Sequence, residues 1–315
     1  MNIQQLEYII AVDNFRHFAR AAEACSVTQP TLSMMIQRLE DELDVKIFDR
    51  FKHPVEPTAV GQNIIKQARA LLRQFDELKE IASSEHKTVK GSFRLGIIPT
   101  IASYLVPVLL QKHRDDCQGI ELTLKESTTN NLINEILTGK LDGGILAGPL
   151  NNPELSEIPL YYEKFYAYVS PDDKAYAEKE IDLDTVDVDR IWLLENEHCL
   201  RKQIEYLCRL KEKKAESKGL KYEAGSIETL IHVVDYNSGI TIIPEMHAIG
   251  LDEERQDNLR SLKNRIAVRE VNLAVSGNYV RRAMLDVILN IVRSSVPKSM
   301  QNPDLKKFAV GIFND

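Results

Sequence analysis

A change in hydrophobic periodicity near residue 90 divides this chain of 315 residues into two unlike parts. Before that point, apolar residues recur at the spacing of amphipathic helices. From Gly91 onward, short apolar runs alternate with amphipathic stretches, which indicates strands alternating with helices. We therefore predict an α/β protein in which a small helical domain precedes a larger domain built on a mostly parallel sheet.

The helical part begins with three predicted helices. Apolar spacing predicts one helix over residues 3–14, and an alanine-rich run predicts a second over residues 18–24. Thr28 then supplies a suitable N-cap, and Pro30 falls in the next helical turn, where its missing N–H costs nothing. This third helix should extend to about Leu43.

The third helix has two faces of different chemistry. One face is apolar and is expected to point inward: Leu32, Ile36, Leu39 and Leu43. The other face has hydrogen-bonding groups and no acid: Gln29, Ser33 and Gln37, flanked by Pro30, Met34 and Arg38. Glutamine can pair with adenine edges and arginine with guanine or phosphate, which favours contact with DNA. A polar solvated face on an ordinary helical domain is the alternative.

A short β wing is predicted after this helix. Its basic side chains are available for phosphates: Lys46, Arg50, Lys52 and His53. Acids at the end of the helix are expected to stay outside a groove: Glu40, Asp41, Glu42 and Asp44. The formal net charge of −7 argues weakly against attraction of the whole chain to nucleic acid. A local basic footprint remains compatible with that charge.

Three motifs together resemble the N-terminal domain of LysR-type regulators. They are Thr28-Gln29-Pro30-Thr31-Leu32-Ser33, Phe48-Asp49-Arg50 and Thr58-Ala59-Val60-Gly61. The resemblance implies a winged helix-turn-helix over residues 1–57 that binds double-stranded promoter DNA and works with RNA polymerase. The expected DNA contacts are Thr28, Gln29, Pro30, Thr31, Ser33, Met34, Gln37, Arg38, Arg50 and Lys52.

A long linker helix with a hinge is predicted over residues 58–87. Apolar residues recur along it with a 3.5-residue period, the seam of a coiled coil: Ile64, Ala68, Leu71, Phe75, Leu78 and Ala82. A long helix packed within one chain is the alternative. A winged helix-turn-helix generally reads two half-sites as a symmetric pair, so we expect a homodimer. The LysR resemblance further implies assembly into a homotetramer.

The regulatory domain is expected to span residues 88–315. Its order of strands and helices resembles the LysR-type effector domain, which has two Rossmann-like lobes shaped like a periplasmic binding protein. The resemblance implies lobe I at residues 88–162 and 269–315, and lobe II at residues 163–268, with a ligand cleft between them. Thr100 and Thr129 lie at strand-to-helix turns, where free N–H groups face a ligand. A simple capping hydroxyl is the alternative for each.

The chain contains four cysteines, of which Cys199 has distinctive neighbours. Cys199 falls in the first turn of a predicted helix, where the helix dipole favours an anion. His198 precedes it, and Arg201 and Lys202 follow. Such surroundings lower a thiol pKa and hold the thiolate.

Cys208 lies at the other end of the same predicted helix, on an apolar stripe that indicates burial. If one helix joins the two cysteines, their Cα atoms lie roughly 13–14 Å apart. A disulfide needs Cα atoms within about 7 Å, so the pair cannot bond unless the segment unwinds. Ordinary core residues, metal ligands and a static disulfide remain alternatives on these residues alone.

The segment Leu194-Glu195-Asn196-Glu197-His198-Cys199-Leu200-Arg201, followed by Cys208, resembles the redox segment of peroxide-sensing LysR-type activators. The similarity extends over roughly residues 1–296, although residues 211–218 and the C-terminus depart from the pattern. The resemblance implies a peroxidatic Cys199, a resolving Cys208 and a reversible disulfide between them. It also implies a peroxide pocket lined by Thr100, Thr129, His198 and Arg269. Cys25 and Cys117 are expected to be structural.

The sequence therefore predicts a hydrogen-peroxide-sensing regulator, an activator of oxidative-stress defence genes. No cofactor or metal is expected. The chain lacks the layout of a signal peptide and any run of ~18 apolar residues, so a cytoplasmic protein without membrane contact is expected. A LysR-type regulator gated by a small metabolite in the cleft is the main alternative. An enzyme such as a thiol peroxidase is disfavoured, because the helix-turn-helix would then be unexplained.

Overall fold

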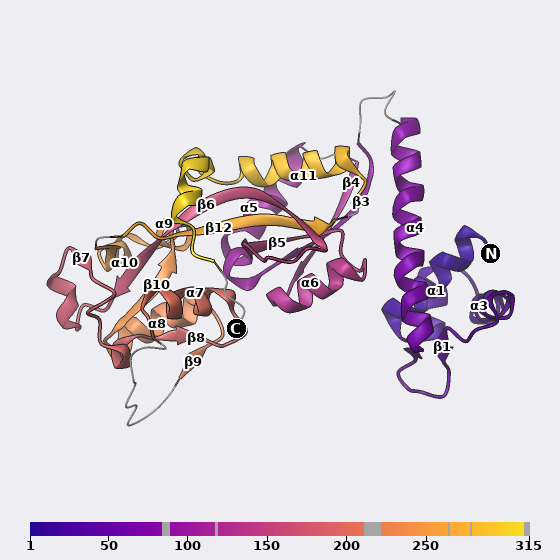
Figure 1. The fold of residues 1–315 in the computed structure, drawn as a ribbon, viewed down its shortest axis with the longest axis horizontal. Coiled ribbons are helices and arrows are strands. Elements are labelled where there is room, and N and C mark those ends of the chain that lie inside the picture. Colours follow the sequence, from indigo (N-terminus) through magenta and orange to yellow (C-terminus); the bar gives the residue numbers. More distant parts are fainter. Residues whose placement is uncertain (84–88, 117–118, 211–221, 264, 278, 312–315) are drawn as a thin grey trace. The chain divides into compact units, whose positions relative to one another are not determined.

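The computed structural model describes residues 1–83, 89–116, 119–210, 222–263, 265–277 and 279–311. The chain forms two compact units (Figure 1). The first comprises Met1–Gly91 with Thr138–Lys140 and Asn278–Ala283, and the second comprises Ser92–Leu137, Leu141–Gly277 and Met284–Asp315. Within the described ranges, no helix is long and apolar enough to cross a membrane.

The first unit is a helical domain with a small wing. Its elements are α1 (Ile3–Phe15), α2 (Phe18–Ala24), α3 (Gln29–Leu43), the antiparallel pair β1 (Phe48–Asp49) and β2 (Glu56–Pro57), and α4 (Ala59–Ser83). Thr28 caps α3, because its side chain accepts a hydrogen bond from the Thr31 amide. The fully buried side chains Leu32, Ile36 and Leu39 join this core, as predicted. Leu43 is exposed, because α3 ends there at a left-handed Asp44.

The second unit is built on one continuous sheet. Its strands are β3 (Gly91–Ile97), β4 (Ile120–Glu126), β5 (Gly143–Gly148), β6 (Leu155–Val169), β7 (Glu180–Ile181), β10 (Ile240–Pro244), β11 (Leu259–Leu262) and β12 (Val268–Ser276). They follow the order β4-β3-β5-β12-β6-β11-β7, with β10 also paired to β6. A smaller parallel pair joins β8 (Leu193–Leu194) to β9 (Glu223–Ala224).

The prediction of a mostly parallel sheet is wrong. β12 runs antiparallel to both β5 and β6, and β10 and β11 run antiparallel to β6. Parallel pairing joins β3 to β5 and β11 to β7. The reason is that β6 and β12 are long strands of opposite direction that cross between the two halves of the unit. Their register places Arg269 opposite Glu163.

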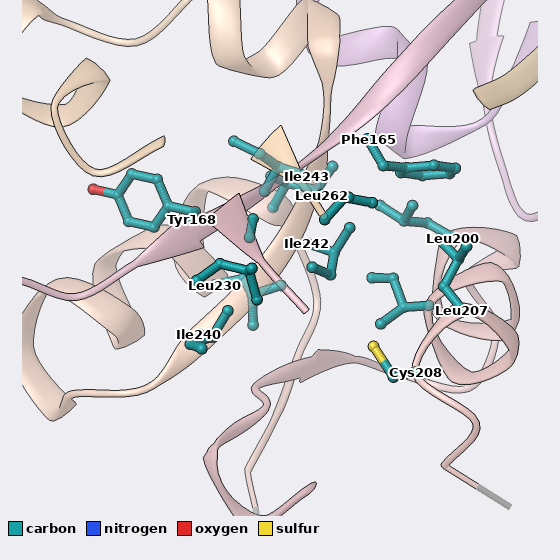
Figure 2. Packing of buried hydrophobic residues seen from close by; sticks show 14 of the residues in the cluster. Phe165, Tyr168, Leu200, Leu207, Cys208, Leu230, Ile240, Ile242, Ile243 and Leu262 are labelled. Carbon is teal, nitrogen blue, oxygen red and sulfur yellow. The ribbon is translucent and has the colours of Figure 1, made fainter. Parts of the chain in front are cut away.

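Helices flank this sheet, and one of them, α7, carries the cysteine segment. They are α5 (Pro99–Asp116), α6 (Thr129–Leu137), α7 (Cys199–Leu207), α8 (Ile227–Asn237), α9 (Glu245–Ile249), α10 (Glu253–Gln256) and α11 (Arg282–Ser294). The side chains of α7, α8 and β10 pack into one buried apolar cluster together with parts of β6 (Figure 2). This cluster fixes α7 against the sheet.

Candidate redox site and DNA-binding face

Cys199 is the first residue of α7 and is 5% exposed. The chain reaches it from β8 through a turn in which the His198 amide donates to the Glu195 carbonyl at 3.2 Å. The Thr129 hydroxyl, the backbone N–H groups at the start of α7 and the charge of Arg269 all favour the ionised form of its thiol. Groups from three separate elements, α6, α7 and β12, therefore influence this sulfur atom.

Burial raises the pKa of the Cys199 thiol above its ordinary value, and this effect outweighs the opposing influence of Arg269, Thr129 and the backbone amides. The expectation of a lowered pKa is therefore wrong. Arg201 does not act on the sulfur, because its guanidinium donates to Glu205, Glu223 and the Leu194 carbonyl, each at 2.7 Å. Lys202 is exposed. The cation that influences the pKa of Cys199 is therefore determined by the tertiary structure and not by proximity in the sequence.

Arg269 is the buried cation of the site, with no exposed surface. Its Nη1 donates to Thr100 Oγ1 at 2.9 Å, and its Nε donates to Glu163 Oε1 at 2.7 Å. Thr100 is itself buried, and Thr129 is half-buried. The structure thus links Thr100 to Arg269, Arg269 to Cys199, and Cys199 to Thr129. His198 is the N-cap residue of α7 and makes no side-chain capping bond.

Glu163 is a site residue that the sequence did not predict. It is fully buried and forms an ion pair with Arg269. Only the antiparallel pairing of β6 with β12 brings the two residues together, and they lie 106 positions apart in the chain. No local pattern in the sequence signals this contact.

Cys208 is the C-cap of α7 and has no exposed surface. Figure 2 shows its sulfur among apolar side chains, including Leu200 and Leu207. Neither Cys199 nor Cys208 is part of a disulfide in this structure. Since α7 is an unbroken helix between them, the predicted separation of roughly 13–14 Å applies to this state. Cys25 is half-buried, whereas Cys117 and residues 211–218 lie outside the described residues.

Two long-range hydrogen bonds hold α7 in its helical form. The buried Gln203 side chain donates from Nε2 to the Val310 carbonyl at 2.7 Å. Arg265 Nη1 donates to the Leu207 carbonyl at 2.8 Å, which satisfies a carbonyl in the last turn of the helix. Val310 in turn donates its amide to the Val268 carbonyl at 2.8 Å. The C-terminal segment therefore connects α7 to β12.

The outer face of α3 lies at the surface of the first unit. Its exposed residues are Thr28, Gln29, Pro30, Thr31, Met34, Gln37 and Arg38, and Ser33 is half-buried. Arg50 of the wing donates to Ser33 at 3.1 Å and to Glu40 at 3.2 Å, and Lys52 pairs with Glu56 at 2.6 Å. A groove of about 530 Å³ runs beside this face and is lined by basic residues that include Arg16, Arg20, Arg50 and His53.

Glu40 does not belong with the solvent-exposed acids at the end of α3. It is 1% exposed, and its carboxylate accepts hydrogen bonds from the amides of Ile47 and Phe48. The buried carboxylate therefore ties the base of the wing to the helix. Its anionic charge is met by Arg50 at 3.2 Å and by Lys46 at 3.7 Å.

The apolar seam of α4 is only partly covered within one chain. Ala68 is buried, but Leu71 is 46% exposed and Leu78 is 62% exposed. The side chain of Ala82 lies outside the described residues. Exposed leucines at heptad spacing are the surface that a second helix covers in a coiled coil.

Two protein families match the chain. Residues 3–62 match the bacterial regulatory helix-turn-helix protein, lysR family, and residues 86–296 match the LysR substrate binding domain. A hydrogen peroxide-inducible genes activator of Haemophilus influenzae is 35% identical over 246 residues, which are 78% of this chain and 81% of that protein. The DNA-binding transcriptional dual regulator OxyR of Escherichia coli is 35% identical over 257 residues, 81% of this chain and 82% of that protein.

Solved structures of OxyR proteins also resemble this chain. A full-length OxyR mutant from Pseudomonas aeruginosa aligns with a TM-score of 0.78 and 31% identity, covering 93% of this chain and 98% of that one. A hydrogen-peroxide-bound OxyR mutant from Corynebacterium glutamicum aligns with a TM-score of 0.62 and 25% identity, covering 93% of this chain and 92% of that one.

Proposed function

This chain belongs to the LysR family of bacterial transcription regulators, and we propose that it acts through a redox switch between Cys199 and Cys208. It is a hydrogen-peroxide-sensing activator. The observation that supports the switch is the unequal placement of two thiols on one helix. The charge of the buried Arg269 and the Thr129 hydroxyl act on Cys199, while Cys208 lies in the buried apolar cluster.

The chemistry proceeds in two balanced steps. The Cys199 thiolate attacks one oxygen of hydrogen peroxide, the O–O bond breaks, and the departing hydroxide takes up a proton to leave as water. The sulfur is thereby oxidised to a sulfenic acid. Cys208, as thiolate, then attacks this sulfur, the S–O bond breaks and a second water forms with the proton released by the Cys208 thiol. The product is a disulfide, and peroxide is the oxidant consumed.

Arg269, Thr100, Thr129 and His198 are the proposed peroxide pocket. The Arg269 guanidinium favours the anionic thiolate and the hydroxide that departs, because both carry negative charge. The Thr129 hydroxyl can donate a hydrogen bond to the thiolate, and Thr100 holds Arg269 in place. Burial keeps bulk water away from the sulfenic acid.

The second step requires α7 to unwind, because its length keeps the two sulfur atoms apart. Unwinding removes Cys208 from the apolar cluster and breaks the hydrogen bonds from Gln203 to Val310 and from Arg265 to Leu207. The rest of lobe II must then repack. This rearrangement is the proposed signal to the DNA-binding unit.

The DNA-binding unit is proposed to read promoter DNA through the exposed face of α3. A homodimer formed along the α4 seam, assembled further into a homotetramer, would present paired helices to two half-sites, with RNA polymerase as the downstream partner. We place the winged domain at residues 1–57, the linker at 58–87 and the two lobes in the remainder. The protein is proposed to be a cytoplasmic regulator and not an enzyme.

Gln29→Ala should weaken specific binding by about 1–3 kcal/mol in a gel-shift titration. Unaltered affinity would contradict the choice of this face.

Peroxide titration followed by disulfide mapping tests the switch. Purified reduced protein is treated with increasing peroxide, and its thiols are then mapped by mass spectrometry. A Cys199–Cys208 disulfide should form at peroxide concentrations below those that oxidise Cys25. Thiols that stay reduced while a cleft-bound metabolite alters DNA binding would instead favour metabolite gating.

A further inference from the structure

Glu163 is a buried carboxylate at the back of the redox site, on the strand opposite Arg269. Neither side chain has exposed surface. Glu163 Oε1 accepts a hydrogen bond from Arg269 Nε at 2.7 Å and lies 2.5 Å from Arg269 Nη2. Removing either partner of such a buried ion pair is strongly destabilising, because it leaves an uncompensated charge away from water.

The Glu163 carboxylate is itself anchored from two further elements. Tyr104 of α5 donates its hydroxyl to Oε1 at 3.2 Å. The Met246 amide of α9 donates to Oε2 at 3.3 Å. Contacts from α5, α9 and β12 therefore converge on one side chain of β6. Such a carboxylate is held more rigidly than a surface residue could be.

Glu163 and Thr100 together occupy every nitrogen of the Arg269 guanidinium. Nε and Nη2 face Glu163, while Nη1 donates to Thr100 Oγ1 and Nη2 to the Thr100 carbonyl at 3.2 Å. Because the guanidinium is a planar fork, bonds at all three nitrogen atoms fix its orientation as well as its position. The orientation of the charge beside Cys199 is thus set from behind by Glu163.

We propose that Glu163 is a positioning residue of the peroxide response, which holds the Arg269 guanidinium beside Cys199 and offsets part of its positive charge. This proposal rests on the proposed function of Cys199. Glu163 touches neither the sulfur nor the peroxide in this scheme. It acts through Arg269 alone, and it sets how acidic the Cys199 thiol is.

The charges around Cys199 support this assignment. The charge of Arg269 on β12 acts on the sulfur, and Thr129 contributes a neutral hydroxyl from α6. Glu163 and the neutral phenols of Tyr104 and Tyr161 act on Arg269, and Arg269 in turn acts on His247 of α9. Burial, followed by the charge of Arg269, lowers the pKa of His247 to about 3, so this imidazole is uncharged at neutral pH. Glu163 is therefore the one anion among these groups.

Two substitutions separate charge from position. Glu163→Gln keeps the shape and a hydrogen-bond acceptor but removes the negative charge. It should lower the half-titration point of Cys199 alkylation by about one pH unit, because the Arg269 charge is no longer offset.

Glu163→Asp keeps the charge but moves it back by the length of one methylene group. It should slow peroxide oxidation at matched thiolate fraction by roughly tenfold, because Arg269 follows the shorter side chain.

The experiment measures iodoacetamide alkylation of the full-length reduced protein against pH, with the Cys199 peptide resolved by mass spectrometry, and the rate of peroxide oxidation in parallel. Glu157→Gln is the matched control, because Glu157 lies on the same strand and also bonds a β12 side chain, Asn272, at 2.9 Å. It should leave both readouts unchanged. Circular dichroism verifies that each variant is folded.

The outcomes are distinct. A lowered half-titration point in folded Glu163→Gln, with an unchanged Glu157→Gln, supports the proposal. An unchanged half-titration point in folded Glu163→Gln, together with an unchanged rate in Glu163→Asp, overturns it. So does an equal shift in Glu157→Gln. If peroxide fails to oxidise Cys199 in the unsubstituted protein, the proposed function fails, while the alkylation profiles still test the role of Glu163.

Discussion

The two ends of α7 present the same functional group in opposite surroundings. At the N-terminal end, the charge of Arg269, the Thr129 hydroxyl and backbone N–H groups all act on the Cys199 sulfur. At the C-terminal end, Cys208 is enclosed by apolar side chains and has no exposed surface. Both thiols are buried, so burial by itself cannot explain why one would react first. The groups that act on Cys199 include a buried guanidinium and a hydroxyl, which could stabilise a thiolate and a departing hydroxide.

This comparison also locates the barrier between the two chemical steps. In the proposed scheme the first step leaves α7 helical, because it forms no bond between the two cysteines. The second step needs nine residues of helix to open, together with the bonds that Gln203 and Arg265 make to it. Oxidation of Cys199 to the sulfenic acid should therefore be faster than the unwinding of α7 and the formation of the disulfide.

Exchanging each cysteine for serine gives the largest expected effect. Cys199→Ser should abolish disulfide formation and the sulfenic acid, because the nucleophile is absent. Cys208→Ser should still form the sulfenic acid, which a dimedone probe detects, but no intramolecular disulfide. Dimedone labelling of Cys208 in the Cys199→Ser variant would break the comparison, because it would show that the buried thiol reacts with peroxide unaided.

The pH dependence of the first step is the next effect in size. Burial raises the pKa of Cys199, so only a small fraction is thiolate at neutral pH. Since the thiolate is the nucleophile, the oxidation rate should rise roughly tenfold per pH unit until pH passes the raised pKa. Stopped-flow oxidation of the Cys208→Ser variant from pH 6 to pH 9 measures this, with ~10-fold steps expected. A rate independent of pH would mean that Cys199 is already ionised.

The smallest expected effect concerns the tie between α7 and the C-terminal segment. Gln203→Leu removes the hydrogen bond to Val310 and should destabilise the helical form of α7 by about 1 kcal/mol. It should speed conversion of sulfenic acid to disulfide by roughly fivefold, since that free energy difference favours unwinding. Quenched time courses on non-reducing gels follow the step. An unchanged rate in a folded Gln203→Leu protein would show that this bond persists during unwinding.

The sequence predicted the local features of the switch but not its environment. The limits of α7 and the burial of Cys208 followed from the spacing of apolar residues, which local packing obeys. The full length of β6 is difficult to predict from the sequence, because Pro159 interrupts the pattern of a strand. The structure accommodates this proline at a register shift between β6 and β12.

The electrostatics of the site could not be predicted from neighbouring residues. His198, Arg201 and Lys202 suggested an acidic thiol, yet Arg201 is committed to Glu205 and Glu223. The charge that acts on the Cys199 thiol is that of Arg269, which the pairing of β12 with β6 positions. Glu40 teaches the same lesson in the first unit, where a residue grouped with surface acids is buried at the base of the wing. Sequence proximity is a poor guide to which charges meet.

Hydrogen–deuterium exchange over residues 199–208, compared before and after peroxide treatment, tests the central claim most directly. In the reduced protein the amides of α7 should be protected, because they are bonded within the helix and packed on the core. Once the disulfide has formed, that protection should be lost, and Cys208→Ser should retain it under the same treatment. Full protection of this segment in protein that carries the mapped Cys199–Cys208 disulfide would contradict the account.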